Sequence, residues 1–111
     1  MEINRDEYIN VKDALNRIGG SMDLYKRLLE QFSGGDHIPP LEEALNNGDM
    51  EDASRLIHAL KGVSANLSLI KLSVLAGDLE HKIKENLDCS DTLSELKNAY
   101  DVTIQQIPEI L

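Results

Sequence analysis

The sequence predicts an all-α protein: an antiparallel up-down-up-down four-helix bundle with one or two additional short N-terminal helices. Apolar residues recur at helical spacings of three and four along most of the chain, and no convincing alternating strand pattern occurs. Short breaks rich in Gly, Pro, Asn and Asp separate these stretches, so successive helices are expected to pack antiparallel. The 111 residues are enough for one domain over 1–111. With one Phe and no Trp, its core must be mainly aliphatic.

The N-terminal half contains three predicted helices. The first, over about residues 10–18, ends at Gly19-Gly20, because glycine commonly follows a helix C-terminus. Ser21 is a suitable N-cap for the second helix, which ends at Gly34-Gly35. The third is short and opens with Pro39-Pro40, whose missing N–H groups are harmless in a first turn. The apolar stripe expected for the second helix consists of Leu24, Leu28, Leu29 and Phe32.

The C-terminal half contains three longer predicted helices. Asp49 is a good N-cap for a helix that runs from Met50 to about Leu67. A turn near Ser68 leads into the next helix. Ser90 is the expected cap of the last helix, and Pro108 falls in the last turn of that helix.

Composition limits the classes of partner. The formal net charge is −9 and no basic stripe is visible, so nucleic acid is not an expected partner. No apolar run approaches the roughly 18 residues of a membrane span. One cysteine, Cys89, and a polar first segment predict a cytoplasmic location. A complete set of apolar stripes favours a monomer.

The stretch "HALKG", residues 58–62, is the most unusual feature of the predicted helices. On a helical projection His58 falls almost directly opposite the apolar stripe and should face solvent. Its neighbours on that face, Ser54, Gly62 and Ala65, are all small. A glycine inside a helix costs about 1 kcal/mol relative to alanine, so Gly62 calls for a reason.

These residues suggest a chemical role for His58. Imidazole is a competent nucleophile near neutral pH, and an attacking nitrogen must come within roughly 3–3.5 Å of the reacting atom. Gly62, at i+4, removes the side chain that would keep a partner's pocket away, and Lys61, at i+3, supplies a cation. The alternative is an ordinary solvated histidine beside a glycine that the helix tolerates.

The stretch "IHALKGVSANLSLIKLSVLAGDLE", Ile57 to Glu80, resembles the signature of histidine-containing phosphotransfer (HPt) domains. The segments "NVKDALNRIGGSMDLYKRLLEQF" and "LEEALNNGDMEDASRLIHALKG" resemble the preceding helices of that family. Ser68 departs from the pattern, because it stands where the family usually has glycine in the turn between two helices. We expect Ser68 to cap the helix that follows this turn instead. The matching residues are His58, Leu60, Lys61, Gly62, Ser64, Leu67, Leu72, Ala76, Leu79 and Glu80.

The resemblance implies a phosphorelay carrier. His58 would accept a phosphoryl group from a receiver-domain aspartyl phosphate and pass it to the aspartate of another receiver. Lys61 would stabilise the phosphoryl oxygens, and Ser64 would be structural. The implied partners are response-regulator receiver domains and a hybrid or sensor histidine kinase. The domain would bind no cofactor, and Mg²⁺ would come with the receiver. The expected docking surface consists of Ser54, Arg55, Gly62 and Ala65.

Other functional classes fit the sequence less well. His37 and His81 have no helical i, i+3 or i+4 partner histidine, so no metal site is expected. There is no Gly-rich phosphate loop, which argues against an ATP-dependent kinase, although whether the carrier counts as an enzyme stays open. The main alternative is a non-catalytic helical bundle that binds receivers or other signalling proteins without taking phosphate. A dimerising kinase fragment would need a separate ATP-binding domain.

Overall fold

The computed structural model describes residues 5–111, with side chains from residue 7 onward, and all of its regular structure in that range is helical. The predicted all-α class is therefore confirmed. Two short helices precede the longer ones, as predicted. The helices are α1 (Arg5–Tyr8), α2 (Val11–Arg17), α3 (Met22–Ser33), α4 (Ile38–Asn46), α5 (Met50–Asn66), α6 (Ile70–Lys84) and α7 (Ser90–Ile110).

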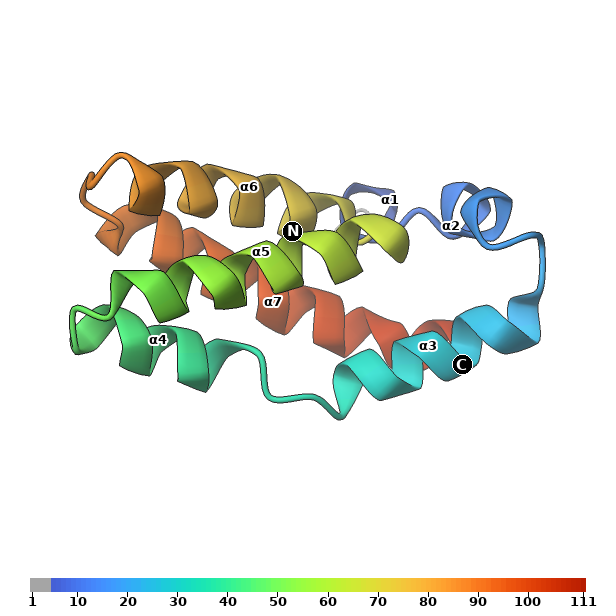
Figure 1. Ribbon diagram of the computed structural model, residues 1–111. Coiled ribbons are helices and arrows are strands. Elements are labelled where there is room, and N and C mark those ends of the chain that lie inside the picture. Colours follow the sequence, from blue (N-terminus) through green and yellow to red (C-terminus); the bar gives the residue numbers. More distant parts are fainter. Residues whose placement is uncertain (1–4) are drawn as a thin grey trace.

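The three longest helices, α5, α6 and α7, lie side by side, and each runs opposite to the one before it (Figure 1). Helices α3 and α4 follow one another along the other side of the molecule, where α4 packs on α5 and α3 packs on α7. The short α1 rests on α6 and α7. None of the described helices combines the length and the apolar character that a membrane span requires.

The helix ends follow the predicted breaks in most places. Ser21 Oγ accepts the Leu24 N–H at 3.2 Å, and Asp49 Oδ1 accepts the Asp52 N–H at 3.1 Å, so both are N-caps as predicted. Gly34 is the C-cap of α3, and the two prolines open α4.

The predicted cap of α7 is wrong. Ser90 is already the first helical residue, and Cys89 before it makes no side-chain capping bond. Asp88 Oδ1 instead accepts both the N–H (2.9 Å) and the hydroxyl (2.7 Å) of Ser90. A carboxylate is a stronger acceptor than a hydroxyl. The two hydrogen bonds from Ser90 lower the pKa of Asp88.

The core is aliphatic except at α3, where the predicted stripe needs correction. Leu24 is 37% exposed, and Tyr25 beside it is fully buried with Leu29 and Phe32. Tyr25 can be buried because its hydroxyl donates a 2.9 Å hydrogen bond to the carbonyl of Leu67, at the end of α5. Burial raises the pKa of Tyr25 to about 12, so the hydroxyl stays a donor.

The turn between α5 and α6 also differs from expectation. Ser68 does not cap α6; it adopts a left-handed conformation (φ +53°), and Leu69 occupies the cap position without a side-chain bond. The Ser68 hydroxyl donates to Asp13 Oδ2 at 2.6 Å, and the Ser68 carbonyl accepts the Asn10 N–H at 3.0 Å. The left-handed conformation explains why glycine suits this position. In this protein Asn10 and Asp13, in the N-terminal segment, hold Ser68 in the left-handed conformation.

Candidate functional site

The candidate site lies midway along α5, on the face that points away from the core. The side chain of His58 is 74% exposed, whereas Ile57, Leu60 and Ser64 are buried, so the imidazole faces solvent as the projection predicted. Ser64 is buried and donates its hydroxyl to the carbonyl of Leu60 at 2.6 Å, so its polar group is satisfied within α5. The sequence had assigned it this structural role.

Glu80, on α6, joins the two functional candidates on α5. Its Oε2 lies 2.7 Å from His58 Nδ1, and its Oε1 accepts a 2.6 Å bond from Lys61 Nζ. The Glu80 side chain is only 6% exposed, and the Lys61 side chain is 40% exposed. Sequence reasoning matched Glu80 to the family signature but gave it no role. The one available signal was a glutamate directly after the core residue Leu79.

The electrostatics of this cluster decide which imidazole nitrogen is free. The hydrogen bond from Lys61 holds the pKa of Glu80 below its usual value; burial opposes this shift and the bond from His58 adds to it. Glu80 is therefore ionised near neutral pH and can only accept hydrogen bonds. The proton of a neutral His58 must then sit on Nδ1 and be donated to Glu80. The lone pair is left on Nε2, on the other side of the ring.

Two glycines flank the cluster. Gly62 is exposed, and a Cβ built there would meet no atom within 4 Å, so packing within this chain does not require glycine. Gly77, on α6, lies under the stem of Lys61, where a Cβ would be 3.6 Å from Lys61 Cδ. Gly62 thus leaves open space beside His58, and Gly77 leaves room for Lys61.

The remaining docking candidates lie around His58 with different exposure. Ser54 and Ala65 are half-buried, and their small side chains project little beyond the helix surface around His58. Arg55 is exposed, and its Nε bonds Asp52 Oδ1 at 3.1 Å, so its charge is partly matched within α5. These positions lie around His58 on α5, and the hydrogen bond of the imidazole goes to Glu80 on α6 instead.

The other histidines stand apart from this site. His81 is exposed on α6. His37 stacks on Phe32, with ring centroids 4.5 Å apart, and its Nε2 bonds the Phe32 carbonyl at 3.2 Å. Among the side chains of residues 7–111 no group of three or more His, Cys, Asp or Glu is arranged to hold a metal ion.

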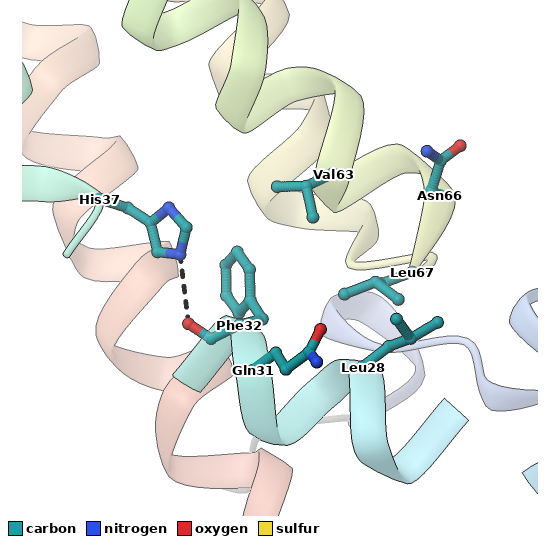
Figure 2. A pocket seen from close by; sticks show the side chains of 7 residues that line it. All are labelled: Leu28, Gln31, Phe32, His37, Val63, Asn66 and Leu67. Atoms are coloured by element: carbon teal, nitrogen blue, oxygen red, sulfur yellow. Dashed lines mark hydrogen bonds between the residues drawn. The ribbon is translucent and has the colours of Figure 1, made fainter. Parts of the chain in front are cut away.

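An apolar pocket lies between α3 and α5. Figure 2 shows the side chains that line it, and the sequence did not predict it. Its volume is about 310 Å³. Val63 and Asn66 bring it close to Gly62 along α5, and the stacked His37 and Phe32 close its other end. The lining residues are Leu28, Gln31, Phe32, His37, Val63, Asn66 and Leu67.

The fold and the site define a helical domain with an exposed histidine that bonds a buried glutamate on the neighbouring helix. The chain belongs to the Hpt domain family, whose model matches residues 27–106. Comparisons with curated proteins and with solved structures returned no match. Hpt domains carry out histidine phosphotransfer in phosphorelays, where they interact with receiver domains and histidine kinases.

Proposed function

We propose that this protein is a phosphorelay carrier whose His58 exchanges a phosphoryl group with the aspartates of receiver domains. The observation that carries the proposal is the bond between His58 Nδ1 and buried Glu80, at 2.7 Å. It fixes the ring on the helix surface and leaves Nε2 as the outward nucleophile. A solvated surface histidine would need no such partner.

The transfer balances without any proton movement. The Nε2 lone pair of the neutral ring attacks phosphorus, a P–N bond forms, and the P–O bond to the receiver's aspartate breaks. The aspartate leaves as a carboxylate, and the ring becomes an imidazolium that still carries its proton on Nδ1. The carboxylate of Glu80 stabilises this positive charge through the same hydrogen bond. Because the step is symmetrical in kind, it also runs from His58 to a second receiver.

The docking surface follows from the clearance around His58. In this proposal a receiver covers the low surface made by Ser54, Gly62 and Ala65, with Arg55 at its edge. The apolar pocket beyond Gly62 then accepts an apolar side chain from the same receiver, since it opens along the same helix. Mg²⁺ is supplied by the receiver, and the phosphorylated receivers come from a hybrid or sensor histidine kinase system.

The finer architecture belongs to the same proposal. We treat α3 and α4, which run end to end, as one interrupted helix, so that with α5, α6 and α7 they form an up-down-up-down four-helix bundle. The uninterrupted order of these elements along the chain supports this description (Figure 1). The domain, over residues 1–111, then acts as a monomer and binds no cofactor of its own.

A labelling experiment tests the carrier function. The protein is incubated with a panel of receiver domains carrying radiolabelled aspartyl phosphate, and acid-labile, base-stable label on it is measured. We expect label on the wild type and none on His58→Gln. His81→Gln is the matched control, because it removes another exposed histidine and should label normally. Equal label on His58→Gln would exclude His58 as the acceptor. Receivers that bind but never label the protein would favour the non-catalytic binding module.

A further inference from the structure

Lys61 is engaged away from the nitrogen that receives the phosphoryl group. Its Nζ lies 2.6 Å from Glu80 Oε1, on a carboxylate that is almost fully buried, whereas the His58 nitrogen not bonded to Glu80, Nε2, belongs to a side chain that is 74% exposed. The same carboxylate therefore serves both His58 and Lys61 through its two oxygens. In the unphosphorylated protein this lysine balances the charge of Glu80 and does not wait in an open position for phosphate.

We propose that Glu80 and Gly77 hold Lys61 in this resting position, and that phosphorylation of His58 releases the ammonium group toward the phosphoryl oxygens. Glu80 and Gly77 are then positioning residues that set how far the transfer equilibrium lies toward phosphohistidine. The inference rests on the proposed carrier function and adds to it a residue-level control of the equilibrium.

The charge balance before and after transfer gives the physical reason. Before transfer, Glu80 carries one negative charge, Lys61 carries one positive charge, and the ring is neutral. Afterwards the ring is an imidazolium that binds Glu80 through Nδ1–H. The phosphoryl group bound to Nε2 carries two negative charges on its oxygens. Residues at i and i+3 are neighbours on a helix face, so Lys61 can reach that group. Each charge thus exchanges one partner for another of opposite sign.

Gly77 makes the resting position sterically possible. The stem of Lys61 crosses α6 there, and a Cβ at residue 77 would sit in ordinary contact, 3.6 Å from Cδ. A methyl group would fit, whereas a longer side chain would occupy the path of the stem to Glu80. Gly77 has no left-handed backbone angle that would demand glycine, and a helix-interior glycine costs about 1 kcal/mol. Room for Lys61 is the physical role that the structure shows for it.

A double-mutant cycle measures the coupling between Lys61 and Glu80. The observable is the equilibrium ratio of phosphohistidine to receiver aspartyl phosphate for the wild type, Lys61→Gln, Glu80→Gln and the double variant. We expect Lys61→Gln to lower this ratio about threefold in the wild type and about tenfold in the Glu80→Gln background, where Lys61 is free for phosphate. Equal effects in the two backgrounds would overturn the inference. Complete absence of label on the wild type would instead contradict the carrier function.

Gly77→Leu tests the resting position without changing a charge. Displacement of Lys61 from Glu80 should raise the phosphohistidine ratio about threefold. Val74→Leu is the matched control, since Val74 is exposed on the same helix one turn earlier and should leave the ratio unchanged. Nitrogen-15 NMR of the lysine side chains gives a readout that needs no phosphate. A slowly exchanging Lys61 ammonium signal is expected in the wild type and Val74→Leu, and its loss in Glu80→Gln and Gly77→Leu. A fast-exchanging wild-type signal would overturn the inference.

Discussion

Helices α5 and α6 are joined at two places that are built in different ways. At mid-length, Glu80 reaches from α6 to His58 and Lys61 through two charged hydrogen bonds on a partly open surface. At the turn, the end of α5 is held by neutral groups of the N-terminal half, the Tyr25 hydroxyl and the Asn10 N–H, together with the Asp13 carboxylate.

The difference matches what each place has to do. The mid-length contacts involve side chains whose charge partners can change while the helices stay where they are. The turn uses a fully buried tyrosine and a left-handed serine, which cannot rearrange without disturbing the packing. We therefore expect substitutions at mid-length to change phosphotransfer and substitutions at the turn to change stability.

Gly62→Gln should have the largest effect and should separate the two properties completely. The added side chain projects into the open space beside His58, where a receiver must approach, so transfer should slow roughly 100-fold. The free energy of unfolding should stay the same or rise by up to about 1 kcal/mol, because glycine is a poor helix former. Transfer rates and urea unfolding measure the two effects. An unchanged transfer rate would show that clearance at residue 62 is unnecessary.

Tyr25→Phe should show the opposite behaviour. The variant keeps the buried ring but leaves the Leu67 carbonyl without its donor, which should cost about 1–3 kcal/mol of unfolding free energy. Phosphotransfer should be unaffected under conditions where the variant is folded. Urea unfolding measures the loss, and the transfer rate at low temperature is the control. A tenfold slower transfer in a fully folded variant would mean that the turn also governs the site.

The elements that could be predicted from sequence are those whose cause is local. Helical periodicity and the caps Ser21 and Asp49 depend on residues within one turn, and the outward direction of His58 follows from the pattern of a single helix. Leu24 was misplaced in the core because an aliphatic residue usually outranks a tyrosine in such a stripe. The hydroxyl partner that reverses this ranking lies on another helix.

The contacts that sequence reasoning missed all cross between elements. Glu80 matched the family signature without a role, because only the pairing of α5 with α6 sets it beside His58 and Lys61. The expected cap at Ser68 failed for the same reason, because Asp13 and Asn10, more than fifty residues earlier, compete for its polar groups. The pocket between α3 and α5 likewise has no local signature.

Two substitutions of Ser68 should distinguish strain from hydrogen bonding at the turn. Ser68→Ala removes the bond to Asp13 but keeps a Cβ in the left-handed region, and should cost about 1 kcal/mol. Ser68→Gly loses the same bond but relieves about 1 kcal/mol of backbone strain, so its stability should stay near that of the wild type. Urea unfolding of both variants makes the comparison. Equal losses would show that the left-handed conformation stores no strain.

The smallest expected effect is a pH dependence at Asp13. The hydroxyl of Ser68, and then Arg17, lower the pKa of the Asp13 carboxyl below its ordinary value of 3.8. A carboxyl whose pKa is lowered in the folded state stabilises that state above the unfolded pKa, and this contribution is lost as the pH falls through the folded pKa. Asp13→Asn should therefore unfold at lower urea than the wild type near pH 7. The two midpoints should converge as the pH falls below 3.8. A constant difference down to strongly acidic pH would show that Asp13 holds the turn by shape and not by charge.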